Sequence, residues 1–132
     1  MVDSMNDNID VKIEETTEKQ FSMTLSGGEE VISLGRDVVR GLNVPSFIKI
    51  LVSENYDEIV FTPCAEKEHM SFKVPEKVFT QHSGMRMYSK AFVHDVLVRN
   101  GFDKTKTYNF KGRYLNEQKN AIVFPLTIEE KE

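Results

Sequence analysis

Alternating apolar and polar positions mark the start of the folded part of the chain. Residues 21–25 (Phe-Ser-Met-Thr-Leu) alternate with a period of two, which predicts a half-buried strand. The Ser-Gly-Gly sequence at 26–28 favours a turn, and residues 31–34 predict a second strand that returns antiparallel to the first. The domain is therefore expected to begin with a short hairpin.

Two longer hairpins are predicted farther along the chain. In residues 47–62, Ile48, Ile50 and Val52 share one face, and the Asn and Asp residues between 54 and 57 favour a turn. Residues 108–126 repeat this pattern, with aromatic residues alternating with polar and basic ones. A further short strand is predicted at 71–74, ahead of a proline.

Two helical segments separate these strands. Val38, Val39 and Leu42 form one apolar stripe in the first segment, residues 36–42. A helix of about two turns is not stable alone in water, so we expect it to cover the open end of a sheet. The second segment, residues 90–100, follows a serine in the N-cap position and stops at an Asn-Gly pair.

The order of these elements occurs twice. Residues 31–61 and 85–124 each predict strand, helix and hairpin, and both end on Ile-Val-Phe followed closely by proline. We interpret this as a duplication that produces an α+β fold. Two tandem strand-helix-hairpin units would form a small, mostly antiparallel, β-barrel-like domain with pseudo-two-fold symmetry. The alternative is that the halves are unrelated, since any two strand-helix-hairpin units show similar patterns. Few aligned residues of the two halves are identical.

Length and charge distribution suggest one domain with an acidic extension. The 132 residues suit a single domain, and we expect a disordered acidic tail at 1–19 followed by one duplicated domain at 20–128. Unit one would span about residues 21–64 and unit two about residues 70–128. Residues 21–69 hold eight acidic and four basic side chains, whereas residues 70–128 hold four acidic and ten basic ones. The two units are therefore expected to carry opposite charge.

Composition argues against several classes of protein. No apolar run approaches the roughly 20 residues of a membrane span. The single cysteine, Cys64, has no partner for an internal disulfide, which favours a cytoplasmic location. His69, His82 and His94 are spread along the chain without metal-ligand spacing, so neither a metal nor a cofactor is expected. A catalytic pair of Ser89 and His94 lacks an orienting group, so we expect neither an enzyme nor a small-molecule substrate.

Residues 34–44 (Leu-Gly-Arg-Asp-Val-Val-Arg-Gly-Leu-Asn-Val), together with the hairpin ending at 59–61, resemble the AbrB/SpoVT-type family. In that family two strand-helix-hairpin units, normally from two chains, interleave their hairpins into a small barrel that binds DNA. Arg36 and Arg40 fall where the family carries arginines near the helix. Two units in one chain would form a pseudo-dimer of the same kind. The chain as a whole also resembles small proteins of Gram-positive bacteria and their phages.

Two hypotheses of function follow. The first is a non-enzymatic, AbrB-like transcriptional regulator that binds double-stranded DNA. Its expected nucleic-acid-binding residues are the cations near the paired helix starts and on the second hairpin, namely Arg36, Arg40, Arg86, Lys90, Lys111 and Arg113. The alternative is a protein-interaction or assembly module in which the acidic unit of one molecule meets the basic unit of another. Monomer and dimer both remain open.

The basic second hairpin also has two interpretations. Lysines and arginines surround Tyr108, Phe110 and Tyr114, and exposed aromatic rings could stack on bases. Strict alternation instead predicts an ordinary amphipathic strand, with the rings turned inward and the cations in water.

Overall fold

The computed structural model describes residues 21–78 and 84–127. The predicted tail at 1–19, residues 79–83 and the residues after 127 lie outside the described part. The elements are, in chain order, β2 (Phe21–Ser26), β3 (Val31–Leu34), α2 (Arg36–Gly41), β4 (Phe47–Val52), β5 (Glu58–Cys64), β6 (Ser71–Lys73), β7 (Met85–Tyr88), α4 (Lys90–Arg99), β8 (Thr107–Tyr114) and β9 (Ile122–Pro125).

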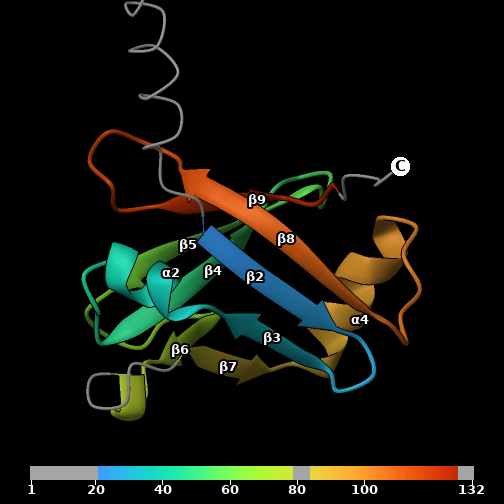
Figure 1. Ribbon diagram of the computed structural model, residues 1–132, viewed down its shortest axis with the longest axis horizontal. Coiled ribbons are helices and arrows are strands. Elements are labelled where there is room, and N and C mark those ends of the chain that lie inside the picture. The colour runs from blue at the N-terminus through green and yellow to red at the C-terminus, as the bar shows by residue number, and fades with distance from the viewer. Residues whose placement is uncertain (1–20, 79–83, 128–132) are drawn as a thin grey trace, which may run out of the picture.

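All of these strands form one 8-stranded sheet, in the order β6-β4-β5-β9-β8-β2-β3-β7. Each pairing in it is antiparallel. The sheet curls into a nearly closed barrel (Figure 1), and its seam lies between the two end strands, β6 and β7. The predicted fold class, a mostly antiparallel and barrel-like α+β domain, is confirmed.

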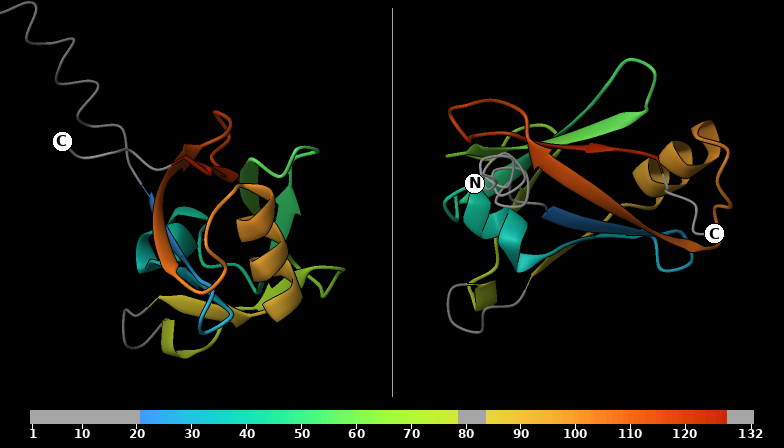
Figure 2. Two further views of the ribbon diagram at one scale, coloured as in Figure 1. Left: turned by 90° about the vertical axis from the view of Figure 1, so that its right-hand side faces the viewer. Right: turned by 45° about the horizontal axis from the view of Figure 1, so that its top comes forward.

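One helix lies at each end of this barrel. In Figure 1 α2 and α4 stand at opposite ends of the strands, and the left view of Figure 2 shows α4 in front of the curled sheet. Val38 and Val39 of α2, and Val93, Val96 and Leu97 of α4, are buried. Both helices therefore act as apolar covers, as the stripe of the first one predicts.

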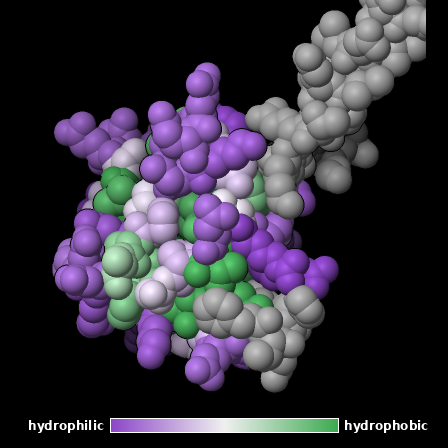
Figure 3. Space-filling model, turned by 90° about the vertical axis from the view of Figure 1, so that its left-hand side faces the viewer, coloured by the Kyte–Doolittle hydropathy of each residue, from purple (hydrophilic) through white to green (hydrophobic). Residues whose placement is uncertain are grey.

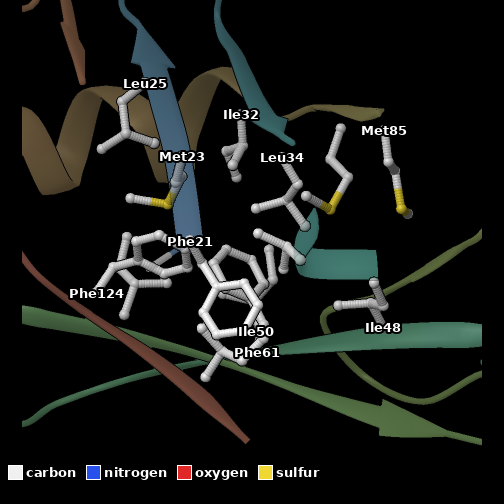
Figure 4. Packing of buried hydrophobic residues seen from close by; sticks show 14 of the residues in the cluster. Phe21, Met23, Leu25, Ile32, Leu34, Ile48, Ile50, Phe61, Met85 and Phe124 are labelled. Carbon is white, nitrogen blue, oxygen red and sulfur yellow. The ribbon is translucent and has the colours of Figure 1, made fainter. Parts of the chain in front are cut away.

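The core consists of the inward positions of the strands together with these helix stripes. Figure 4 shows Phe21 and Met23 of β2 pointing toward Ile50 and Phe61 on the opposite wall. The Phe61 ring also meets Phe124 edge to face, with 5.6 Å between centroids and 82° between planes. Each of these side chains is at most 3% exposed, so both walls contribute to one continuous core.

Local details differ from the predictions at two places. β5 does not stop at Thr62 but continues through Pro63 to Cys64, and Pro63 stands opposite Ile48 of β4. The described pairing of β5 with β9 ends at Phe61, so the missing N–H of Pro63 interrupts no ladder on that side. Ser89 occupies the N-cap position of α4 as predicted, but its hydroxyl makes no capping hydrogen bond.

Candidate nucleic-acid interface

Helix α2 presents two arginines at one end of the barrel. Arg36 and Arg40 are four residues apart and both are exposed, because the stripe of Val38 and Val39 takes up the inward face. Gly35, at the N-cap, donates its backbone N–H to the carbonyl oxygen of Ser22 in β2 at 3.2 Å. The start of α2 is therefore fixed beside the start of β2.

The junction at Gly35 is crowded by two neighbouring side chains. A Cβ on Gly35 would lie 2.5 Å from Oδ1 of Asp37 and 2.9 Å from Oγ of Ser22. Asp37 stands in the first turn of α2, where a carboxylate interacts favourably with the helix dipole, and its buried Oδ1 has no hydrogen-bond partner among the described residues. The start of α2 is therefore held by the backbone hydrogen bond between Gly35 and Ser22 rather than by a side-chain cap.

Strand β8 brings two more cations to the same end. Lys111 and Arg113 are exposed and alternate with buried Phe110 and Gly112. In the β2·β8 pair, Lys111 stands opposite Ser22, the residue whose carbonyl holds Gly35. Lys111 is therefore one strand, about 4.8 Å, from the residue that anchors α2.

Tyr114 connects strand β8 to helix α2. Tyr114 ends β8, and its hydroxyl donates a hydrogen bond to the Gly41 carbonyl of α2 at 2.8 Å. Its ring packs edge to face on Phe21, with centroids 5.0 Å apart. Four of the six predicted residues, Arg36, Arg40, Lys111 and Arg113, therefore border the first residues of β2. We call these four the basic end; Figure 3 views this end of the barrel, where hydrophilic side chains gather around smaller hydrophobic patches.

Lys119 lies beside the basic end, although it is not one of the six predicted nucleic-acid-binding residues. It belongs to the turn between β8 and β9, and its Nζ lies 5.8 Å from the centre of the Tyr114 ring. The sequence places it in the basic hairpin but does not reveal that the turn folds back toward α2.

The remaining two predicted residues lie elsewhere and are paired with acids. Nη2 of Arg86, on β7, donates to Oε1 of Glu29 at 2.9 Å. Nζ of Lys90, at the start of α4, lies 3.9 Å from Oε2 of Glu30. Both pairs are exposed, so each contributes little to stability, but each offsets a cation that the hypothesis assigns to DNA.

The outer surface between these regions carries short polar side chains. Asn109 of β8, Thr24 of β2 and Ser33 of β3 stand opposite one another in one row across three strands, and the longer Arg86 of β7 follows at its end. Oγ1 of Thr24 donates to Oδ1 of Asn109 at 2.7 Å. A row of such small residues would let another backbone approach the sheet closely. The sequence shows these residues as the polar half of each alternation but not their alignment.

The aromatic rings of the second hairpin turn inward. Phe110 is 2% exposed, and Tyr108 stacks on Phe102 with centroids 4.7 Å apart. With Tyr114 held by α2, all three rings are engaged in packing. The amphipathic interpretation of this strand is confirmed.

Within residues 21–78 and 84–127, no group of three or more His, Cys, Asp or Glu side chains could hold a metal ion. Nε2 of His94 lies 2.9 Å from the Gly27 carbonyl, which gives it a structural partner. Burial raises the pKa of the Cys64 thiol and the Glu68 carboxylate raises it further, whereas Lys49 lowers it.

Comparison with protein-family models, with curated proteins and with solved structures found no match for this chain. The resemblance to AbrB/SpoVT-type domains therefore stays a prediction. None of the helices in the described ranges is long and apolar enough to cross a membrane.

Proposed function

We propose that this protein is a non-enzymatic DNA-binding regulator whose basic end contacts the phosphate backbone of double-stranded DNA. The observation that carries the proposal is the convergence of Arg36 and Arg40 on α2 with Lys111 and Arg113 on β8. These residues are far apart in sequence, and the junction at Ser22 and Gly35 brings them together. Clustered exposed cations are the electrostatic footprint of nucleic-acid binding.

The geometry favours phosphate contacts over base stacking. The aromatic rings of the hairpin are packed in the fold, and the neighbouring surface is lined by Ser22, Thr24 and Asn109 rather than by rings. Cations with short hydroxyl and amide side chains can bind phosphate and sugar oxygens. Arg86 and Lys90 contribute less in this proposal, because Glu29 and Glu30 lie against them.

A salt titration of binding to random duplex DNA tests the proposal. Four phosphate contacts predict a slope of about −3.6 in log K against log salt concentration. The double variant Arg36→Ala/Arg40→Ala should weaken binding and reduce the slope. Lys104→Ala/Lys106→Ala is the matched control, because it removes two exposed cations beside α4, at the opposite end. Equal losses in the two variants, or no binding at low ionic strength, would contradict the assignment.

A protein-interaction module is the second candidate. Leu51 of β4 is 45% exposed and stands opposite half-buried Val60 of β5, so two apolar side chains lie side by side on the outside of this wall. A partner protein would contact this apolar surface rather than the acidic and basic units. Glu29 and Glu30 of the acidic unit already pair with Arg86 and Lys90 of the basic unit within one chain. Absence of DNA binding would favour this candidate.

We also propose that the barrel is a duplicated, pseudo-two-fold pseudo-dimer. Supporting it, like elements of the two halves pair: β3 with β7 and β5 with β9. In addition, β2 pairs with β8 and β6 pairs with β4, so the first strand of each unit lies against the first strand of the longer hairpin of the other unit. A single chain could then close its own barrel, and light scattering should give the mass of a monomer.

A further inference from the structure

We propose that the acidic segment formed by residues 1–20 occupies the basic end of its own chain and competes there with DNA. The segment holds two lysines and six acids, namely Asp3, Asp7, Asp10, Glu14, Glu15 and Glu18. The competition rests on the proposed function, whereas the contact between segment and basic end can be measured without DNA.

The place where the segment enters the fold is the first support. It joins β2 at Phe21, which stands opposite Gly112, between Lys111 and Arg113 on β8. Ser22, the next residue, anchors the N-cap of α2. The described chain therefore begins beside the cations of the basic end, and the nearest acid in the sequence, Glu18, is three residues before it.

The length of the segment is the second support. Glu18 precedes Phe21 by three residues, which is at most about 10 Å of chain. Asp3, the most distant acid, precedes Phe21 by 18 residues, which can span up to about 60 Å, so all six acids can reach the basic end. A tether this short gives the acids an effective concentration on the order of millimolar at that surface.

Charge complementarity selects this occupant over others. Single exposed ion pairs are weak and are screened within about 10 Å at 0.1 M salt. Several tethered pairs together can hold the segment at low salt, yet duplex DNA, with one charge per about 1.7 Å of its axis, can displace it. The segment would then lower the apparent affinity of the basic end for DNA and exclude polyanions of lower charge density.

The contact is tested first, in the full chain without DNA. A nitroxide on Cys64→Ser/Ser4→Cys should broaden the amide signals of Arg36, Arg40, Lys111 and Arg113 more than those of α4. Glu14→Gln/Glu15→Gln/Glu18→Gln in the labelled chain, or 0.5 M salt, should reduce this broadening at least about threefold. Equal broadening with the acidic and the neutral segment overturns the proposal. Broadening that arises only when labelled and isotope-enriched chains are mixed assigns the segment to a second copy and also overturns it.

DNA affinity tests the competition. In the unlabelled chain, Glu14→Gln/Glu15→Gln/Glu18→Gln should tighten DNA binding by about three- to tenfold at low salt, and the gain should disappear at high salt. Glu54→Gln/Asp95→Asn/Asp103→Asn is the matched control, because it removes the same number of exposed acids on or near α4. Equal gains in both variants overturn the competition and leave the proposed function standing. DNA binding by none of the chains overturns the proposed function, and the nitroxide measurement then decides the contact alone.

Discussion

Val60 of β5 stands directly opposite Val123 of β9. The two Ile-Val-Phe triplets that repeat in the sequence thus pair with each other, antiparallel, in the sheet. Four pairings, β2·β8, β3·β7, β4·β6 and β5·β9, join the first half of the chain to the second. Neither half can complete a sheet from its own strands.

Separated halves should therefore fold only together. Residues 65–69, between β5 and β6, are exposed and offer a site for division into two fragments. Each fragment alone should lack a cooperative thermal transition, because it loses four of its strand pairings. An equimolar mixture should recover the strand signal in circular dichroism and a 1:1 mass by light scattering. A fragment that unfolds cooperatively by itself would contradict this account of the sheet.

Gly112→Ala should destabilise the barrel. A Cβ there would lie 2.6 Å from the Val123 carbonyl oxygen and 2.7 Å from the Phe124 ring, so the β8·β9 contact must open. We expect a loss of about 2 kcal/mol or more in the free energy of unfolding, measured with urea. Gly28→Ala is the control, since it is exposed and its new contact, 3.3 Å to the Thr105 carbonyl, is mild. Similar losses in the two variants would show that crowding at β9 is not the cause.

Tyr114→Phe should loosen the join between β8 and α2. It removes the hydrogen bond to the Gly41 carbonyl and keeps the ring against Phe21. The expected cost is about 1 kcal/mol, with faster hydrogen exchange in α2. Tyr88→Phe should change little, because Tyr88 is 65% exposed. Unchanged exchange in α2 would show that this bond does not hold the helix.

The reactivity of Cys64 should depend on its two charged neighbours. Burial and Glu68 raise the pKa of the thiol, so the thiolate fraction at a given pH is below that of a free cysteine. The midpoint of the pH profile of alkylation should accordingly lie above that of a cysteine peptide. Glu68→Gln should lower this midpoint and Lys49→Gln should raise it. Shifts of the same sign in both variants would refute the electrostatic explanation.

Deletion of residues 1–18 should leave the fold intact. These residues contain few large apolar side chains, so they have little surface to bury against the barrel. In moderate salt the melting temperature should change by no more than about 2 °C, measured by calorimetry. A large decrease would mean that Val11 and Ile13 pack against the domain.

Local sequence patterns predicted most strands and both described helices. Each of these elements buries one face, so its apolar residues recur with the period of a strand or a helix. The alternation at Ser22, Met23 and Thr24 specifies which residues point outward but not which strand lies beside them. Pairing between halves depends on side chains that meet only after the chain has folded. For the same reason the sequence did not reveal that Arg86 faces Glu29, or that Lys119 turns back toward Tyr114.

The pairing of β2 with β8 has a consequence for the order in which the protein forms. Thr24 and Asn109, which stand opposite each other, are 85 residues apart in a chain of 132. Contacts of such separation are slow to form, since a long loop must close before they are made. During synthesis the first strand must wait, with its Phe21 and Met23 side chains unburied, until β8 has left the ribosome. Folding of the barrel is therefore expected to be slow.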